Sequence, residues 1–372
     1  MLRESPTFIE INLSALRHNF LELRHKIGPS LKIMAVVKSN AYGHGTTQVA
    51  PVLDEAGADF FGVGTVDEGI ELREVGIAKP IVILLGLLDG RTEPFFEHRL
   101  TPVVENIRVA KLLGAAAKKK GQSLAIHLKV DTGMSRLGVP MDQWGGFWQE
   151  FSKIDSLRSE GLLSHLAEAG DPEFTAFQRE NFSKILSDLE KCGVKPQWRH
   201  LANSIEAIEG EGRGCNLVRL GLVLYGAAPI PRLKEKIALK PVLSLKTRII
   251  SLKKLAPGTP VSYNRTFRTK RESRIGVLPL GYADGYPRIV SNKAFVLVRG
   301  QKVPVVGTVC MDLSMVDLTD CPSAEVGDEV VVIGRQGSEE ISADDLAQWS
   351  ETISYEIFCR LSPRLRRSYV EN

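Results

Sequence analysis

The chain has 372 residues, of which 43% are hydrophobic and 25% are charged, so it has enough apolar material for a core of two domains. Lys and Arg number 48 against 44 Asp and Glu, and the scattered charges exclude a basic stripe for nucleic acid. The longest apolar run, residues 80–86, is shorter than the roughly 18 residues of a membrane span, and residues 1–6 lack a signal-peptide stretch. We therefore expect a cytoplasmic protein that binds neither nucleic acid nor membrane.

The cysteine pattern indicates a reducing compartment. The chain has five cysteines, an odd number, and none forms a C-x-x-C pair. They lie far apart, at Cys192, Cys215, Cys310, Cys321 and Cys359. This spacing predicts neither a disulfide framework nor a zinc site, and we expect no bound metal.

The first part of the chain, residues 8–235, alternates short apolar runs with segments of helical period. Strands are predicted at 8–13, 31–38, 60–64, 80–86, 101–104, 124–131, 161–166, 199–203 and 217–221. Helices are predicted at 14–27, 46–56, 67–75, 107–121, 141–154 and 173–192. Apolar strands separated by amphipathic helices indicate a parallel sheet covered on both faces. About eight such units favour a (β/α)8 TIM-type barrel, with an open doubly wound sheet as the alternative.

The second part, residues 236–372, has strands without intervening helices. Runs at 243–252, 273–280, 294–298, 303–309, 314–318 and 329–333 predict a mainly antiparallel β domain, followed by a helix near 343–361. The boundary is expected within about five residues of 235, and residues 1–7 are expected to pack with this domain. Three arginines near the end, Arg364, Arg366 and Arg367, are interpreted as a solvated basic cluster.

Reactive and polar side chains follow several of the predicted barrel strands, where barrel enzymes place their chemistry. Each has an ordinary interpretation by itself, as a surface lysine, a packed histidine, or a cap or turn residue. Five strand ends of this kind in one barrel are harder to explain in that way. The residues are Lys38, Lys129 and Asp131 with Arg136, His165, His200 with Asn203 and Ser204, and Arg219 with Gly221.

This set suits an anionic ligand that reacts with an amine. A lysine is a nucleophile toward aldehydes, and hydroxyls and backbone amides bind phosphate. Pyridoxal 5′-phosphate needs these groups. In this hypothesis Lys38 bonds to the cofactor, Ser204 and the amide near Gly221 hold its phosphate, and Arg219 faces its ring nitrogen.

Residues 35–45, with the sequence AVVKSNAYGHG, closely resemble the cofactor-lysine motif of the alanine racemase family, which is pyridoxal-phosphate dependent and of fold type III. The resemblance extends over nearly the whole chain, and further segments follow in the family's order. These are HLKVDTGMSRLG at 127–138, SHLA at 164–167, HLANS at 200–204, VRLG at 218–221, VSY at 261–263, GYADG at 281–285, CMD at 310–312 and ISYE at 353–356.

The resemblance implies a role for each matching residue. Lys38 carries the cofactor and is the base on one face of the substrate, and Tyr263 from the other subunit of a homodimer acts on the opposite face. Cofactor contacts are implied for Tyr42, His165, Asn203, Ser204, Arg219, Gly221 and Tyr355. Substrate contacts are implied for Arg136 and the partner's Met311, with Tyr282 at the entrance. Lys129 matches a position that is often carboxylated, which makes it an anionic partner for Arg136.

The implied reaction interconverts L-alanine and D-alanine by two-base proton transfer and supplies D-alanine for peptidoglycan. Tyr263 and Tyr355 would crowd side chains larger than a methyl group, which favours alanine over serine or lysine as the substrate. A racemase of broader specificity, a fold-related decarboxylase and a non-catalytic cofactor carrier remain alternatives. A dinucleotide site is disfavoured because no third glycine follows Gly62 and Gly64 at the required spacing.

The chain departs from the family pattern after the predicted catalytic tyrosine. The family usually has glycine there, and this chain has Asn264. We expect the added β-carbon to tilt the loop that carries Tyr263.

Overall fold

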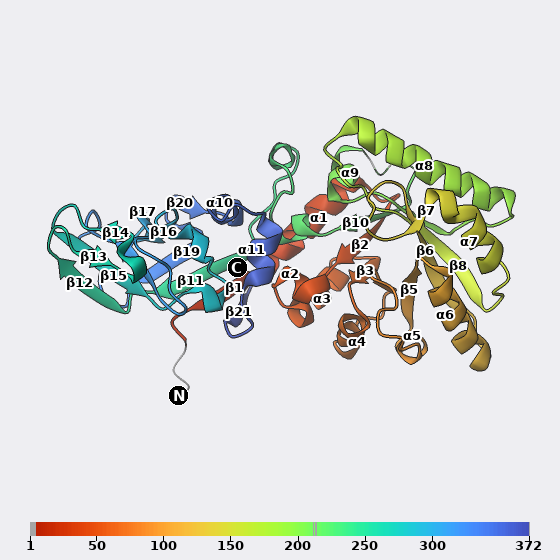
Figure 1. The fold of residues 1–372 in the computed structure, drawn as a ribbon, viewed down its shortest axis with the longest axis horizontal. Helices are drawn as coiled ribbons and strands as arrows, with labels where there is room; N and C mark the ends of the chain where they lie inside the picture. The colour runs from red at the N-terminus through yellow and green to blue at the C-terminus, as the bar shows by residue number, and fades with distance from the viewer. Residues whose placement is uncertain (1–4, 211, 213, 372) are drawn as a thin grey trace.

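The computed structural model describes residues 5–210, 212 and 214–371. A parallel barrel lies at the right of Figure 1, and a mainly antiparallel β domain lies at the left. The two meet where helix α2 (Lys38–Tyr42) contacts helix α11 (Ser354–Arg360). This arrangement confirms the predicted fold class.

Eight parallel strands form the barrel, in the order β10-β2-β3-β4-β5-β6-β8-β9. Their bounds are β2 Lys32–Val36, β3 Phe60–Val63, β4 Ile81–Ile83, β5 Leu100–Val104, β6 Leu124–Asp131, β8 Leu157–Leu163, β9 Trp198–His200 and β10 Leu217–Leu220. A short strand, β7 (Val139–Pro140), pairs with β6. Between β9 and β10, the amides of Asn216 and Arg219 donate to the carbonyls of Arg199 and Ala202, both at 3.1 Å. These two bonds bring the last strands together and nearly close the barrel.

The barrel interior is packed with side chains. One buried cluster takes a residue from each of six strands: Met34, Phe60, Val82, Val103, Leu163 and Leu217. A filled interior of this kind supports a site only at the end of the barrel, beyond the last side-chain layer.

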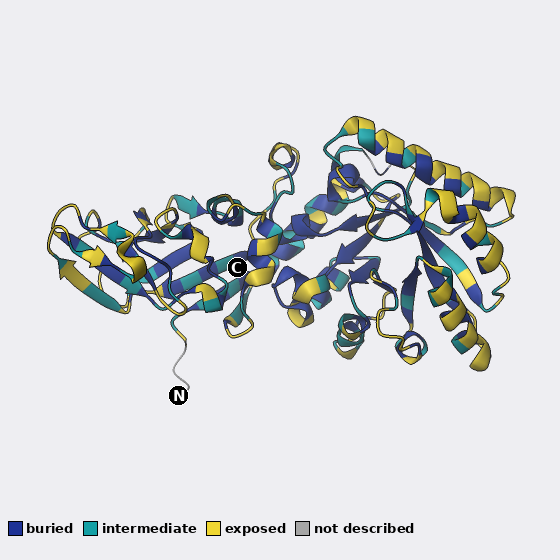
Figure 2. Cartoon of the chain, in the orientation of Figure 1, coloured by how far each residue is buried: buried dark blue, intermediate teal, exposed yellow. Residues whose placement is uncertain are grey.

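Amphipathic helices cover the outside of the barrel, with their buried faces toward the sheet and their exposed faces outward (Figure 2). They are α1 Leu13–Ile27, α3 Thr46–Glu55, α4 Val66–Glu74, α6 Ile107–Lys119, α7 Trp144–Phe151 and α8 Pro172–Lys191. Side chains of Asn12, Thr65, Asn106 and Asp171 accept amide hydrogens where α1, α4, α6 and α8 begin. Three shorter helices follow strands or loops and were not predicted: α2, α5 Glu93–Glu97 and α9 Ser204–Glu209.

The second domain is built on a sheet in the order β17-β16-β19-β11-β1-β21, with β20 paired to β19. The bounds are β1 Phe8–Asn12, β11 Leu243–Arg248, β16 Phe295–Val298, β17 Gln301–Pro304, β19 Glu329–Gln336, β20 Glu339–Ile341 and β21 Arg366–Val370. One smaller sheet contains β12 Ser251–Leu255, β15 Ser273–Leu278 and β18 Ser314–Asp317. Another pairs β13 Pro260–Val261 with β14 Phe267–Arg268. Two helices, α10 (Ala343–Trp349) and α11, occupy the region predicted as one helix.

The strand predicted at 8–13 as part of the barrel region forms, but it lies in the second domain. As β1 it pairs antiparallel with β11 and parallel with β21. Its burial alternates, with Ile9 and Ile11 fully buried between partly exposed neighbours. Alternation is typical of a sheet with one face on the core, whereas the barrel strands are buried on both faces.

The interpretation of the C-terminal arginines as a solvated cluster holds for Arg364 and Arg366, which are exposed, but not for Arg367, which is half-buried. Arg364 donates to Asp284 and to Asp312, both at 2.7 Å. Arg366 and Arg367 lie in strand β21, and Arg367 Nε donates to the carbonyl of Gly43 at 2.8 Å. The chain end therefore joins the second sheet to the barrel turn that follows Lys38.

Two helical glycines offer a matched test of how tightly the outer helices pack. A β-carbon at Gly114 in α6 would collide with Ile154, whereas one at Gly145 in α7 meets no atom within 4 Å. We expect Gly114→Ala to lower the free energy of unfolding by about 1–3 kcal/mol. Gly145→Ala should raise it by about 0.5–1 kcal/mol because alanine restricts the unfolded chain. Urea unfolding of both variants measures the difference, and equal effects would show that α6 packs loosely.

Candidate active site

The predicted cofactor residues converge at the carboxyl ends of the barrel strands, facing α11 of the second domain. Lys38 follows β2, and its charge is close enough to contribute to the lowered pKa of His165, which follows β8. Arg219 lies in β10 and contacts His165 directly. Sequence reasoning therefore placed residues separated by 181 positions in one site (219 minus 38).

Lys38 begins a turn of unusual handedness. The four residues after it, Ser39, Asn40, Ala41 and Tyr42, have φ angles of 52° to 55°, in the left-handed region. Left-handed backbone costs roughly 1–2 kcal/mol per non-glycine residue, so the rest of the fold must hold this turn. Gly43 ends the turn, at a point where a β-carbon would collide with the carbonyl of Phe358 in α11.

The left-handed turn brings Tyr42 back toward β10. A β-carbon placed on Gly221 would lie 2.6 Å from the Tyr42 hydroxyl, so only glycine leaves room for this hydroxyl. The amide of Gly221 donates to Ser204 Oγ at 3.3 Å, and the rings of Tyr42 and Tyr355 are 5.9 Å apart. Burial raises the pKa of Tyr42, which keeps its hydroxyl protonated. Hydroxyls and an amide thus gather around Gly221, as binding of a phosphate requires.

The side chain of Asn203 caps a helix, whereas it was predicted to contact the cofactor. Its Oδ1 accepts the amides of Ile205 and Glu206, at 3.1 and 3.2 Å, and so caps helix α9. The cap orients Ser204, the first residue of that helix. A direct contact between Asn203 and a cofactor stays a prediction.

Arg219 is a buried cation with several acceptors. Its Nη2 donates to the carbonyls of Ser164 at 2.7 Å and Leu201 at 3.2 Å, and to His165 Nδ1 at 3.1 Å. Its Nη1 donates to the carbonyl of His200 and to His200 Nδ1. Burial lowers the pKa of Arg219 to about 10, so the guanidinium stays protonated at neutral pH.

Neutral histidines surround this cation. Because His165 and His200 accept from Arg219 through Nδ1, each neutral ring carries its proton on Nε2. His200 Nε2 then donates to His127 Nδ1 at 2.9 Å. Burial lowers the pKa of His127 and of His165 to about 3, with Arg219 the next cause, and burial also lowers that of His200. The sequence indicated His200 only as a polar side chain at a strand end and gave no role to His127, although both lie in motifs shared with the family.

Lys129 and Arg136 lie on the β6 side of the site. Lys129 is buried in β6, and burial lowers its pKa to about 8. Arg136 contributes to this lowering, so the two charges are near each other. Arg136 itself is exposed, in a loop whose amides at Gly133, Met134 and Ser135 donate to Asp131.

The remaining predicted residues lie on the second domain and are exposed. Tyr263 is 69% exposed, Met311 55% and Tyr282 43%. Two of them lie side by side, because the amides of Tyr282 and Ala283 donate to the carbonyls of Cys310 and Met311 at 3.0 Å. Within the described part of the chain, the backbone hydrogen bonds of these three residues join them to other residues of the second domain. These bonds therefore do not connect Tyr263, Met311 or Tyr282 to the barrel site of the same chain.

Asn264 has a backbone that explains the usual glycine of the family. Its φ is 59°, in the left-handed region that glycine adopts freely and asparagine tolerates better than most residues. Ser262 and Arg265 beside it also have positive φ angles. Asparagine therefore occupies the conformation that glycine would adopt, and a tilt of the loop that carries Tyr263 stays a prediction.

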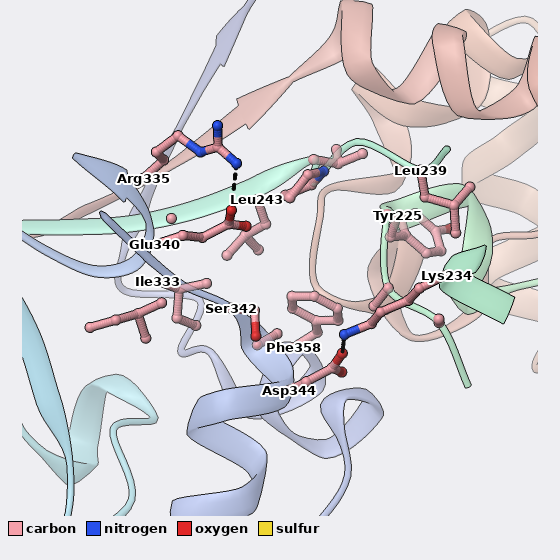
Figure 3. Close-up of a pocket in the computed structure, with 18 of the residues that line it drawn as sticks. Tyr225, Lys234, Leu239, Leu243, Ile333, Arg335, Glu340, Ser342, Asp344 and Phe358 are labelled. Carbon is pink, nitrogen blue, oxygen red and sulfur yellow. Dashed lines mark hydrogen bonds and ion pairs between the residues drawn. The ribbon is translucent and has the colours of Figure 1, made fainter. Parts of the chain in front are cut away.

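A cavity of about 300 Å³ lies between the barrel and the second domain, but it is separate from the site. Figure 3 shows Tyr225, Leu243, Ile333 and Phe358 along its walls, with an ion pair between Lys234 and Asp344 at 2.7 Å. None of the predicted site residues, all of which the structure describes, lines it.

Within the described residues, no helix combines the length and apolar character that crossing a membrane requires.

The fold and the site together define a two-domain barrel protein with an amine, a protonated guanidinium and two hydroxyls beside a glycine at the barrel mouth. Sequence comparison then shows the family. The profile described as "Alanine racemase, N-terminal domain" matches residues 11–229, and "Alanine racemase, C-terminal domain" matches residues 242–369. The chain belongs to the alanine racemase family, a family of isomerases.

Individual relatives agree over the full length. A protein of Halothermothrix orenii named alanine racemase is 44% identical over 366 residues, covering 98% of this chain and 97% of that protein. The crystal structure of an alanine racemase from Streptomyces lavendulae shares 35% identity at a TM-score of 0.94, covering 99% of this chain and 98% of the other. An alanine racemase structure from Bacillus anthracis, with bound L-Ala-P, shares 34% identity at a TM-score of 0.92, covering 100% and 97%.

The three histidines around Arg219 generate a prediction about pH. Their pKa values are lower in the folded chain than the ordinary value of 6.5, so the unfolded chain binds more protons between about pH 3 and 6.5. The free energy of unfolding should therefore fall as the pH drops through this range. Nuclear magnetic resonance of the ring protons should show His127, His165 and His200 unchanged between pH 5 and 8. Titration of any of the three in that interval would contradict the neutral network.

Proposed function

We propose that this protein interconverts L-alanine and D-alanine, using pyridoxal 5′-phosphate held at the carboxyl ends of the barrel strands. The observation that carries the proposal is the convergence of Lys38 and the buried, protonated Arg219 on His165, with the hydroxyls of Tyr42 and Ser204 gathered at Gly221. Membership of the alanine racemase family supports the same activity. A racemase that also accepts serine or lysine is the nearest alternative.

The residues present fit the cofactor. Lys38 supplies the amine, and the hydroxyls of Ser204 and Tyr42 are donors available to a phosphate, beside the Gly221 amide that donates to Ser204 Oγ. Arg219 would face the ring nitrogen as a cation and disfavour its protonation, which limits side reactions such as transamination. When bound, pyridoxal phosphate withdraws electrons from the substrate's α-carbon as its proton leaves.

Two bases on opposite faces of the substrate suit racemisation, because a proton leaves one face and another arrives on the opposite face. The Lys38 amine would act on one face and the partner subunit's Tyr263 on the other. Each such acid–base contribution accelerates a reaction by about 10²–10⁴-fold. The high exposure of Tyr263 in the single chain, 69%, is what a residue completing another subunit's site would show.

Substrate recognition is assigned to residues near these bases. Arg136 and the partner's Met311 would contact the substrate carboxylate, with Tyr282 at the entrance. Burial lowers the pKa of Lys129 to about 8, so more of its amine is unprotonated at neutral pH than in an exposed lysine, and that form takes up carbon dioxide. The resulting carbamate would be an anionic partner for Arg136. Tyr355, whose ring is near Tyr42, would limit the space beyond a methyl group.

In the cell, we place this reaction in the cytoplasm, where it would supply D-alanine for peptidoglycan. The active unit is proposed to be a homodimer with two shared sites. No step requires nucleic acid or a membrane.

Incubation with L-alanine in deuterium oxide tests the reaction. We expect D-alanine to form with deuterium at the α-carbon, because the returned proton comes from a base that exchanges with solvent. Chiral chromatography with mass spectrometry measures both products. Carbon dioxide release would instead identify a decarboxylase, and no turnover of any amino acid would identify a cofactor carrier.

Mixing two inactive variants tests the shared site. A dimer of one Lys38→Ala chain and one Tyr263→Phe chain has one site with both natural residues and one with neither. Random pairing should therefore restore about a quarter of the natural activity per chain. The control mixes Tyr263→Phe with the double variant, where no site is complete and no activity should return. Lack of recovery in the first mixture, despite demonstrated subunit exchange, would refute sharing.

A further inference from the structure

The left-handed turn after Lys38 is held at its far end by several groups. His44 Nδ1 donates to the carbonyls of Ala41 and Tyr42 at 3.0 Å, and Asn40 Oδ1 accepts the amide of Thr46 at 2.9 Å. Arg367 donates to the carbonyl of Gly43. These contacts act on the last residues of the turn, away from Lys38.

Next to Lys38, the turn is held by a carboxylate from a different barrel unit. Glu68 Oε1 accepts the amide of Ser39 at 2.5 Å, across 29 positions of sequence. Glu68 Oε2 accepts the amides of Gly64 at 2.6 Å and Thr65 at 3.1 Å, where β3 passes into α4. One carboxylate thus ties together the ends of β2 and β3.

Glu68 also has a simpler role, which is to cap helix α4. Glu68 is the third residue of α4, and with Thr65 it forms a capping box at the start of that helix. A capping box requires the contact with Thr65, and it does not require the contact with Ser39. The bond to Ser39 is therefore additional to the cap.

Gly64 brings the carboxylate and the lysine close together. A β-carbon on Gly64 would lie 3.1 Å from Glu68 Oε2 and 3.9 Å from Lys38 Cβ. Lys38 Cβ and the Glu68 carboxylate therefore both lie next to the backbone of Gly64. A carboxylate accepting an amide forms a stronger bond than a neutral acceptor does, which suits it to holding strained backbone.

We propose that Glu68 is a positioning residue for Lys38: by accepting the Ser39 amide, it holds the left-handed turn that aims Lys38 and Tyr42 into the site. The inference rests on the proposed function, because it concerns the amine assigned as base and cofactor anchor. Glu68 touches neither substrate nor cofactor in this account. It acts through the backbone of the residue that follows Lys38.

The test compares Glu68→Gln with Thr65→Ala in the full-length protein as purified. Glutamine leaves one acceptor oxygen for three amides and loses the charge, whereas Thr65→Ala removes the hydroxyl that caps α4 and keeps the Glu68 carboxylate. Amide hydrogen exchange is measured by mass spectrometry on peptides covering residues 36–43 and 64–72. The kcat and KM values for L-alanine and D-alanine are measured on the same preparations.

We expect Glu68→Gln to speed exchange of the Ser39 amide at least tenfold and to lower kcat about tenfold to a hundredfold, with KM changed less than twofold, because misplaced reacting groups slow the chemical step. Thr65→Ala should speed exchange only at the start of α4 and leave kcat within twofold. Unchanged exchange at Ser39 in Glu68→Gln would overturn the proposal. Equal effects of the two variants on Ser39 and on kcat would do the same.

A second variant keeps the test decisive if Glu68→Gln fails to fold. Glu68→Asp retains the charge but is shorter by one methylene, so it cannot bridge both strand ends. Faster exchange at Ser39 in Glu68→Asp supports the proposal, and exchange as slow as in the natural protein overturns it. Because exchange is read without catalysis, an absence of alanine racemisation in the natural protein would refute the proposed function and leave this readout intact.

Discussion

The carboxyl end of the barrel is organised around one buried positive charge. A guanidinium away from water is tolerated only when acceptors surround it, and Arg219 finds three carbonyls and two histidine nitrogens. Those acceptors lie just after β8 and at the end of β9, so satisfying the charge also fixes the end of the barrel where the last strands meet. The same requirement keeps the neighbouring histidines neutral, since a second cation there would be unpaired. Structure and proposed chemistry therefore depend on the same set of hydrogen bonds.

The strained turn after Lys38 solves a different problem. A lysine at the end of a parallel strand ordinarily continues toward solvent, but here four left-handed residues reverse the chain and return Tyr42 to the site. Such a conformation persists only when its surroundings determine it more strongly than local preference does. The contacts that hold it come from α4, from the C-terminal strand and from the close approach of α11 to Gly43. The second domain is thus part of what shapes the barrel site.

Much of the fold was predictable because the spacing of apolar residues along the sequence indicates strands and helices. Seven of the eight barrel strands form within a predicted apolar run or begin one residue before it, whereas β8 begins four residues before its predicted start. Proposed site residues follow or close several of these strands. The misplaced strand β1 could have been recognised by its alternating burial pattern, as in Phe8-Ile9-Glu10-Ile11, which differs from the continuous apolar runs of the barrel. The break between α10 and α11 was harder to predict from the sequence. Glu351, between the two helices, has a positive φ, and no glycine at that position indicates it.

The sequence by itself determined the class of fold and the family, because these depend on local periodicity and on contiguous motifs. Only the tertiary structure decided the partners of Arg364, the chain of neutral histidines and the contact of Glu68 with Ser39. Arg364 and Asp284 are 80 positions apart, and Arg219 and Ser164 are 55 apart. The physical reason is that hydrogen bonds depend on distances of a few ångströms, which chain topology sets and sequence separation does not reveal.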